Sequence, residues 1–257
     1  MRIKFFAEVP VHTMSYVCSG HSGRPQEQIL EFLECTVDGL PEGVNALVVA
    51  ADLQGRERVG GRLLGQTVAE ELVLLVDGGV IPSPSGILLA GDLYDRPDCG
   101  KRGGSGDVAP VWKEFAKHFS IVMGVHGNHD YLDARDLPLN ASVLDAEIQE
   151  WEGLKIGGLC GIMGKPTKNQ RRGSGDYLKL LEGVLRSNPD IMLTHCGPDD
   201  PETGRIGEPT VRMAMERFGT GLVIFGHCFW QDPIAEIGGS QVLNVDGRVI
   251  ILKRGDE

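Results

Sequence analysis

The sequence predicts an α/β fold, in which short strands alternate with longer helices along one chain. Short apolar runs recur from the N-terminus to the C-terminus, and segments whose apolar residues have helical spacing lie between them. The length of 257 residues, with 41% hydrophobic and 24% charged residues, is typical of a globular domain of ordinary size. We therefore expect residues 1–257 to form a single domain.

Short apolar runs bounded by polar or turn residues predict the strands. The expected strands are Ile3–Phe6, Ala46–Ala51, Ile87–Ala90, Ile121–Val125, Lys155–Leu159, Ile191–Thr194, Leu222–Phe225, Gln241–Val245 and Arg248–Leu252. The last two flank Asp246-Gly247, a dipeptide typical of a two-residue turn. We therefore expect them to pair as a hairpin that adds an antiparallel part to the sheet.

Longer amphipathic segments predict the helices. The expected helices are Gln26–Val37, Arg62–Asp77, Ala109–His118, Asp176–Ser187 and Pro209–Phe218. Because these segments alternate with the apolar runs, we expect a mostly parallel sheet with helices on both of its faces.

Composition limits the cellular setting. No apolar run approaches the ~20 residues that span a bilayer. Glu8 and Pro10 interrupt the short apolar stretch at the N-terminus, so a signal peptide is not expected. The six cysteines are isolated and no CxxC occurs, which favours reduced thiols over a zinc ribbon. These features predict a cytoplasmic protein.

The net charge of −11 argues against general nucleic-acid binding, which usually needs a basic face. It does not argue against a phosphorylated substrate, because bound metal ions supply positive charge locally. Some of the acidic residues would then be the metal ligands themselves.

Side chains that can bind or serve a metal follow five of the predicted strands. They are Asp52, Asp92, Asn128 with His129, His195, and His227. Any one of them alone fits a turn or cap residue. Parallel strands, however, deliver the residues at their carboxyl ends to one crevice. The sequence therefore predicts that these side chains share a metal site.

The order of these residues resembles the calcineurin-like metallophosphoesterase superfamily, whose motifs are DxH, GDxxD, GNH(D/E), a lone His and GHxH. The matching segments are Asp52-Leu53-Gln54, Gly91-Asp92-Leu93-Tyr94-Asp95, Gly127-Asn128-His129-Asp130, Thr194-His195 and Gly226-His227-Cys228-Phe229. The likeness runs from about residue 46 to the C-terminus, and the first 45 residues lie outside it. It implies a mixed β-sheet sandwich flanked by helices, with the metal site at the carboxyl ends of strands.

The resemblance implies a centre for two metal ions. Asp92 would bridge both ions, because a carboxylate has two oxygens. Asn128, His195 and His227 would complete the second site, and all of these residues are present.

The first site departs from the family pattern. Asp52 is present, but Gln54 and Phe229 stand where the family has histidines. Gln54 offers only an amide oxygen and Phe229 offers no ligand, so we expect an oxygen-rich first site that holds its ion weakly. The expected cofactors are one or two divalent metal ions, with Mn²⁺ favoured and Zn²⁺, Fe²⁺ or Mg²⁺ as alternatives.

The resemblance also implies the chemistry. Water activated by the metal attacks phosphorus, and His129 protonates the leaving oxygen or stabilises charge on the phosphoryl group. Asp130 or Asp95 would orient His129, with loop capping as the alternative for both carboxylates. Arg96 in GDLYDR resembles the phosphate-binding arginine of protein Ser/Thr phosphatases, and a solvated loop arginine is the alternative.

Two basic loops, residues 96–104 and 164–173, interrupt the acidic chain. They either steer a phosphorylated substrate towards the crevice or form an ordinary solvated surface. His12, His21 and His118 lie outside the motifs and are not expected to bind metal.

The predicted function is metal-dependent hydrolysis of a phosphodiester or phosphomonoester, with a phosphorylated small molecule or nucleotide-type compound as substrate. Two alternatives stay open. A non-catalytic binding or scaffold protein on the same fold would explain Gln54 and Phe229, and a Ser/Thr-type protein phosphatase would explain GDLYDR. The presence of His129, a proton donor that a scaffold does not need, favours the enzyme.

Overall fold

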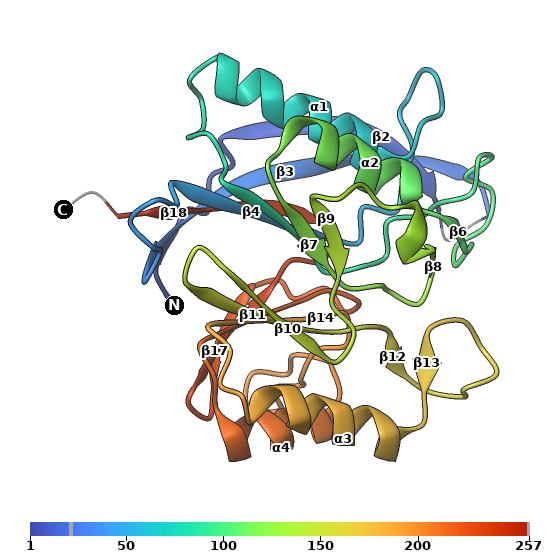
Figure 1. The fold of residues 1–257 in the computed structure, drawn as a ribbon. Coiled ribbons are helices and arrows are strands. Elements are labelled where there is room, and N and C mark those ends of the chain that lie inside the picture. The colour runs from blue at the N-terminus through green and yellow to red at the C-terminus, as the bar shows by residue number, and fades with distance from the viewer. Residues whose placement is uncertain (21–22, 256–257) are drawn as a thin grey trace.

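Two β-sheets pack face to face, and helices cover the outer face of each, which gives the molecule four layers (Figure 1). The computed structural model describes residues 1–20 and 23–255. The predicted α/β class is confirmed, and so is the mixed β-sheet sandwich flanked by helices that the resemblance implied.

The first sheet has the strand order β1-β3-β18-β4-β5-β7-β9, with β2 paired to β3. Its strands are β1 (Arg2–Phe6), β2 (His12–Ser19), β3 (Pro25–Asp38), β4 (Ala46–Ala51), β5 (Gly86–Leu89), β7 (Val122–Gly124), β9 (Ala141–Val143) and β18 (Arg248–Arg254). Strands β4, β5, β7 and β9 run parallel to one another.

The second sheet has the strand order β10-β11-β14-β15-β17-β16. Its strands are β10 (Glu147–Trp151), β11 (Leu154–Leu159), β14 (Ile191–Thr194), β15 (Leu222–Phe225), β16 (Ile234–Ile237) and β17 (Ser240–Asn244). Strands β11, β14, β15 and β17 are parallel. Each sheet therefore contains a parallel block whose strands end at a common edge.

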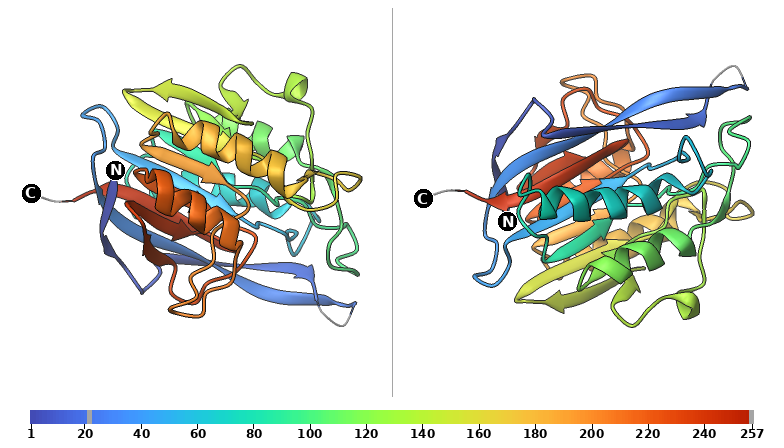
Figure 2. Two further views of the ribbon diagram at one scale, coloured as in Figure 1. Left: turned by 90° about the horizontal axis from the view of Figure 1, so that it is seen from below. Right: turned by 90° about the horizontal axis from the view of Figure 1, so that it is seen from above.

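The helices cover opposite sides of this sandwich (Figure 2). They are α1 (Leu64–Asp77) and α2 (Ala109–His118) over the first sheet, and α3 (Ser174–Leu185) and α4 (Pro209–Phe218) over the second. Short elements in the loops are β6 (Gly106–Asp107) paired with β8 (Asp130–Tyr131), β12 (Ile162–Met163) paired with β13 (Arg171–Arg172), and the 3-10 helix η1 (Ala134–Asp136). Four of the five predicted helices are confirmed.

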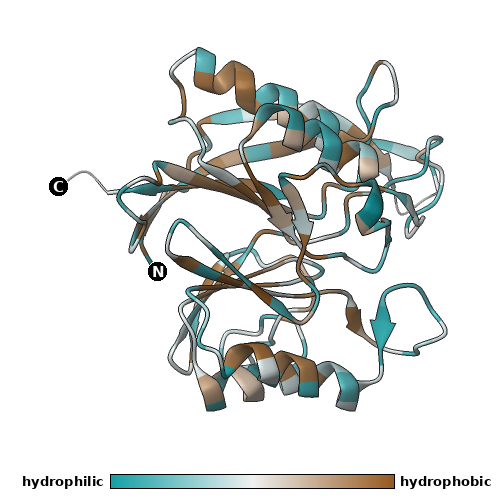
Figure 3. Ribbon diagram, viewed as in Figure 1, coloured by the Kyte–Doolittle hydropathy of each residue, from teal (hydrophilic) through white to brown (hydrophobic). Residues whose placement is uncertain are grey.

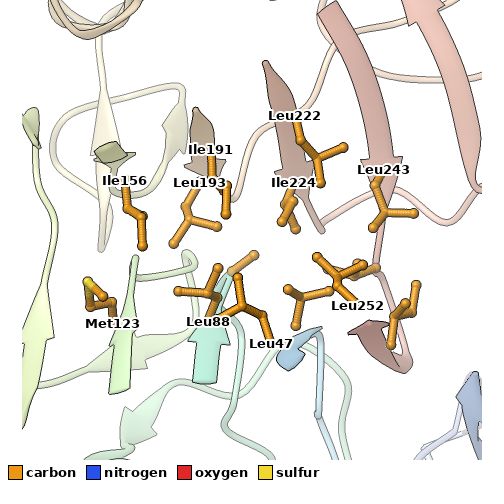
Figure 4. Close-up of a cluster of buried hydrophobic side chains, with 14 of the residues drawn as sticks. Leu47, Leu88, Met123, Ile156, Ile191, Leu193, Leu222, Ile224, Leu243 and Leu252 are labelled. Carbon is orange, nitrogen blue, oxygen red and sulfur yellow. The ribbon is translucent and has the colours of Figure 1, made fainter. Parts of the chain in front are cut away.

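Leucine and isoleucine side chains fill the space between the sheets. Figure 4 shows a row from the second sheet, including Ile191, Leu193 and Ile224, that faces Leu47 and Leu88 of the first. Separate apolar clusters lie beneath each pair of helices. In Figure 3 the central strands are largely hydrophobic, whereas the helices alternate between hydrophobic and hydrophilic residues. Burial of each large apolar side chain stabilises the fold by about 1.5–3 kcal/mol, so these layers hold the strand ends in place.

The helix predicted over Gln26–Val37 does not form, because the segment is part of the long strand β3. Leu30 and Phe32 pack beneath the helices of the first sheet. Leu33 and Cys35 point the other way and pack between the sheets. A strand that is buried on both faces places apolar residues three and four positions apart, which imitates helical spacing.

The predicted hairpin at Asp246-Gly247 is also wrong, because β17 and β18 belong to different sheets. Strand β17 lies between β15 and β16, and β18 lies between β3 and β4, so both strands have partners on each side. Gly247 has a φ of 63°, and its amide donates to the carbonyl of Ala51 at 3.2 Å as the chain crosses. The Asp-Gly pair does make a sharp turn, but the turn links the two sheets.

Helices were also expected on both faces of one sheet, and this expectation is wrong. Each sheet carries helices on its outer face only, because its inner face packs against the other sheet. None of the six cysteines is paired. Within the described ranges, every helix falls short of the length and apolar character that a membrane crossing requires.

Candidate metal centre

A cavity of about 640 Å³ opens where strands from both sheets end. Its wall includes Asp52 after β4, Asp92 after β5, His129 after β7 and His227 after β15. Residues that are far apart in the sequence therefore meet at the carboxyl ends of the parallel strands.

The N-terminal strands form another part of the cavity wall. β2 and β3 contribute Tyr16, Ser19, Gln26, Gln28 and Ile29. β3 pairs with β18, so this segment extends the sheet that also carries β4. The family motifs do not reach these residues, and no motif within the segment indicated that it would border the site.

Asp92, His195 and His227 form a tight group of potential ligands. One ligand atom from each residue lies within 4.8 Å of the other two. His195 Nε2 is 3.2 Å from Asp92 Oδ2, and both side chains are buried. On the other side of the ring, His195 Nδ1 donates to the carbonyl oxygen of Ala90 at 2.8 Å.

This arrangement leaves Nε2 of a neutral His195 ring without a hydrogen. Its lone pair then faces a carboxylate oxygen of Asp92, which is unfavourable unless a cation lies at the site. Burial disfavours a charged ring, but the charges of Asp92 and Asp52 outweigh burial and raise the pKa of His195 to about 10. A proton therefore relieves the pair in the metal-free protein, and a divalent ion can take over that role.

Asn128 and His227 have the properties expected of further ligands. Asn128 Oδ1 is buried and has no hydrogen-bond partner among the described residues, which is costly unless something binds it. Partial loss of water around its ring, with the neighbouring His195, lowers the pKa of His227 to about 4, although the residue as a whole is exposed on the cavity wall. The His227 ring is therefore neutral near pH 7 and able to bind a metal. The donor atoms present therefore fit a divalent ion.

Three of the predicted ligands have a backbone conformation that is rare outside glycine. Asp52, Asp92 and His227 have φ values of 53°, 55° and 70°. Each lies just after a strand, where the left-handed turn redirects its side chain. Such a conformation costs about 1–3 kcal/mol and clusters at functional sites. The Asp92 side chain can take its place only because residue 127 is a glycine. A Cβ at Gly127 would lie 2.0 Å from Asp92 Oδ1.

The first site is built differently from the second. Asp52 Oδ2 accepts the backbone amide of His227 at 2.9 Å. Gln54 donates from Nε2 to Asp92 Oδ2 at 2.8 Å, so its amide nitrogen faces the carboxylate. Ligation through the Gln54 oxygen therefore requires the amide to turn over.

Phe229 and Asp246 complete the wall near the first site. Phe229 is 54% exposed, and its ring centroid lies 4.3 Å from the guanidinium carbon of Arg248. Burial raises the pKa of Asp246 to about 6. Burial, followed by the charge of Asp246, raises the pKa of Asp52 well above its usual range. The sequence did not indicate Asp246 as a site residue, because an Asp-Gly pair between two apolar runs is typical of a hairpin turn.

His129 lies beside the bridging position predicted for Asp92. Its backbone amide donates to Asp92 Oδ1 at 2.8 Å, and its Nε2 lies 3.9 Å from Asp92 Oδ2. Nδ1 is 3.3 Å from the hydroxyl of Ser105. The ring is partly exposed to the cavity, so it can reach a bound molecule.

Asp130 and Asp95 hold loops together. The buried Asp130 carboxylate accepts three backbone amides from the loops after β5 and β7, each at 2.8 Å. Asp95 accepts the amide and the hydroxyl of Ser19 at 2.8 and 2.6 Å. Of the two roles considered for these carboxylates, the contacts fit loop capping, and Ser105 rather than either carboxylate contacts the His129 ring.

Arg96 lies outside the cavity wall. Its side chain is 49% exposed, and its Nε lies 3.3 Å from Asp98 Oδ1. Arg102 and Gly103 of the same basic loop line the cavity instead. The loop therefore borders the site through a different arginine from the one that GDLYDR indicated.

The second basic loop supports the GNHD segment. Asn169 Nδ2 donates to the carbonyl oxygens of Asn128 and Asp130 at 3.1 and 3.0 Å. Arg172 pairs with Asp145 at 2.6 Å. These contacts fix the loop after β7 and give the basic loop a structural role.

Two histidines outside the motifs contact carboxylates elsewhere. His12 lies 2.8 Å from Glu71, and His118 lies 3.1 Å from Glu114. His21 lies outside the described residues.

The chain was compared with protein-family models, curated proteins and solved structures. A family model described as calcineurin-like phosphoesterase matches residues 46–228. Comparison with curated protein sequences gave no match. Among solved structures, TT1561 of Thermus thermophilus has 19% sequence identity and a TM-score of 0.57, with 79% of this chain and 90% of that chain covered. This likeness supports the fold.

Two further solved structures resemble the chain more distantly. A hypothetical protein from Thermus thermophilus has 11% identity and a TM-score of 0.46, with 77% of this chain and 75% of that chain covered. A dimetal phosphatase from Danio rerio has 15% identity and a TM-score of 0.42, with 81% and 88% covered.

Proposed function

The chain belongs to the calcineurin-like phosphoesterase family, and from this premise we propose that it hydrolyses phosphoesters at a metal centre built around Asp92. The proposed ligands of the stronger site are Asp92, Asn128, His195 and His227. Asp52 serves the weaker site, with Gln54 as a further donor once its amide turns over.

One observation carries this proposal. His195 Nε2 and Asp92 Oδ2 are buried 3.2 Å apart, and the single ring proton of neutral His195 is already donated to Ala90. In the metal-free chain a proton on Nε2 relieves this pair, and a divalent ion held between the two atoms can take the place of that proton. The partnerless oxygen of Asn128 supports the same conclusion, because a ligand bond would satisfy it.

The metal, when bound, polarises the phosphoryl group and makes water acidic enough to serve as a nucleophile near neutral pH. The chain supplies the remaining functions. His129 faces the cavity and is proposed to donate a proton to the leaving oxygen, with Ser105 fixing its ring through Nδ1. Arg102 takes the phosphate-attracting role first considered for Arg96, because Arg102 lines the cavity.

The donor types support Mn²⁺ as the working ion. The stronger site mixes nitrogen and oxygen donors, whereas the weaker one offers oxygen alone, which suits Mn²⁺ or Mg²⁺ better than Zn²⁺. Hydrolysis with a single bound ion is also part of the proposal. Gln54 donates a hydrogen bond to Asp92 Oδ2, and a second ion would need that oxygen as a ligand.

The cavity size supports a small phosphorylated or nucleotide-type substrate. Its volume of about 640 Å³ falls within the range of sites that enclose small molecules. The position of Arg96 outside the wall removes the feature that favoured a protein phosphatase.

The test is an assay of metal-stripped protein with Mn²⁺, Zn²⁺, Mg²⁺ or Fe²⁺ added back. The substrates are bis(p-nitrophenyl) phosphate, p-nitrophenyl phosphate and a phosphoserine peptide. We expect metal-dependent hydrolysis of at least one of the two small esters, with the highest rate in Mn²⁺. Folded protein that hydrolyses no substrate with any ion would contradict the proposal and support the scaffold alternative.

A matched pair of variants locates the activity. His195→Ala removes a proposed ligand and should abolish hydrolysis together with tight metal binding. His118→Ala removes a histidine that contacts Glu114 at the end of α2, and it should leave both unchanged. Equal activity in the two variants would place the metal centre elsewhere.

A further inference from the structure

Asp246 reaches the cavity because the chain crosses between the sheets at this point. It follows β17, and its backbone forms a parallel bridge with Ala51, the residue before Asp52. The amide of Gly247 fixes this junction by donating to the carbonyl of Ala51 at 3.2 Å. The crossing therefore carries the Asp246 carboxylate to the side of the cavity where Asp52 lies.

The Asp246 carboxylate has no compensating charge in direct contact. Within residues 1–20 and 23–255, no hydrogen bond or ion pair to this carboxylate is found. Arg248 lies two positions away, but its guanidinium donates to the carbonyl of Trp230 at 2.7 Å and to Asn244 Oδ1 at 3.2 Å. The same guanidinium packs over the ring of Phe229, so Arg248 stabilises the charge of Asp246 without contacting its carboxylate.

Three carboxylates thus line one cavity, those of Asp52, Asp92 and Asp246. The backbone bridge between Asp246 and Ala51 sets the Asp246 and Asp52 carboxylates in the same part of this cavity. Like charges in a partly dehydrated space are unfavourable, and a divalent cation reverses that effect. The partnerless Asn128 Oδ1, buried at the adjoining second site, indicates independently that this region binds an ion.

We propose that Asp246 is a ligand of the first metal site, where it replaces imidazoles that Gln54 and Phe229 do not provide. The inference rests on the proposed function, because it concerns the same metal centre. The first site then consists of Asp52, Asp92 and Asp246 with water. Such an all-oxygen set of hard donors favours Mn²⁺ or Mg²⁺.

The alternative role for Asp246 is to stabilise the crossing between the sheets. The backbone contacts of the crossing do not involve the carboxylate, so Asp246→Asn preserves them while removing the charge. The matched control is Asp77→Asn, which removes one carboxylate from the exposed end of α1, outside the cavity wall.

The first experiment measures Mn²⁺ binding to the metal-stripped full chain by calorimetry, with metal content determined separately. We expect two ions per wild-type chain. Asp246→Asn should weaken one of them by about tenfold or more, since even residues that only support a ligand affect affinity by about 10–100-fold. The other ion should keep its affinity, and Asp77→Asn should match the wild type.

The outcomes separate this inference from the proposed function. Two ions with unchanged affinities in Asp246→Asn would overturn the inference and leave the proposed function standing. A wild-type chain that binds one ion, with an affinity that Asp246→Asn does not change, would also overturn the inference and leave the proposed function standing. No ion in the wild type would overturn the proposed function itself.

A second experiment compares thermal unfolding of the two chains with chelator and with Mn²⁺. Without metal, Asp246→Asn should raise Tm at pH 8, because it removes one of three mutually repelling carboxylates. With saturating Mn²⁺ the order should reverse, because the wild type binds the additional ion more tightly. A lower Tm for Asp246→Asn in chelator would instead show that the carboxylate stabilises the crossing, and would overturn the inference.

Discussion

Raising the pH of the metal-free protein should destabilise it, because His195 and Asp92 share a proton in the folded state. The pKa of His195 rises from its ordinary value of 6.5 to about 10, since the charges of Asp92 and Asp52 outweigh burial. Between these two values the folded chain binds a proton at His195 and the unfolded chain does not. Stability from this proton is therefore fully present below pH 6.5 and declines as the pH rises towards 10.

The size of the effect follows from this difference. One proton corresponds to about 1.4 kcal/mol per pH unit, so the free energy of unfolding should fall by about 2 kcal/mol between pH 7 and 8.5. For a chain of this size the loss lowers Tm by roughly 4–8 °C. Asp246 contributes little to this change, because its pKa of about 6 lies below the window.

Thermal unfolding followed by circular dichroism in the presence of a chelator measures the effect. The control is His195→Gln, which keeps a polar side chain but has no titrating ring. Its Tm should decline less steeply over the same range, and buried Asp52, whose pKa is also raised, accounts for any decline that remains. Saturating Mn²⁺ should also remove the decline, because the ion displaces the proton. A flat profile in the wild type, or an equal slope in His195→Gln, would refute the proposed proton.

Three further predictions test the roles assigned to neighbouring residues. His129→Ala should lower kcat by about 10²–10⁴-fold with unchanged Mn²⁺ content, and undiminished turnover would remove its role as proton donor. Asp130→Asn should lower Tm, because its amide group has only one acceptor oxygen for the three backbone amides that Asp130 accepts. At least one buried amide then has no partner, which costs about 1–3 kcal/mol of stability. An unchanged Tm in chelator would refute loop capping. The pair Gln54→His and Phe229→His should tighten Mn²⁺ binding at the first site in calorimetry, and unchanged affinity would mean that these positions do not limit it.

Local patterns were enough to predict much of the fold. The strands at Ala46–Ala51 and Ile191–Thr194 and the helix at Ala109–His118 have the bounds expected from their apolar spacing. Segment Gln26–Val37 was predicted as a helix because its burial depends on two layers at once, the helices on one side and the second sheet on the other. Spacing along one segment does not show how many of its faces are covered.

The candidate site shows the same division between local and distant information. Asp92, His195 and His227 each follow an apolar run, so their convergence at strand ends could be predicted from the sequence. The sequence did not show that Asp92 comes from the first sheet and the two histidines from the second. Asp246 could not be predicted, because its place beside Asp52 depends on the chain entering the first sheet after leaving the second. The sequence also could not show that Arg102 rather than Arg96 lines the cavity, since this depends on the path of one loop.

The central claim is that the ions held around Asp92 carry out phosphoester hydrolysis. Its most direct test measures the number of bound ions and the hydrolysis rate of bis(p-nitrophenyl) phosphate and p-nitrophenyl phosphate together, as Mn²⁺ is returned to the stripped chain. We predict no turnover without metal and a rate that rises in step with the ions bound. Hydrolysis by the metal-free chain, or full metal occupancy without hydrolysis of either ester, would contradict the claim.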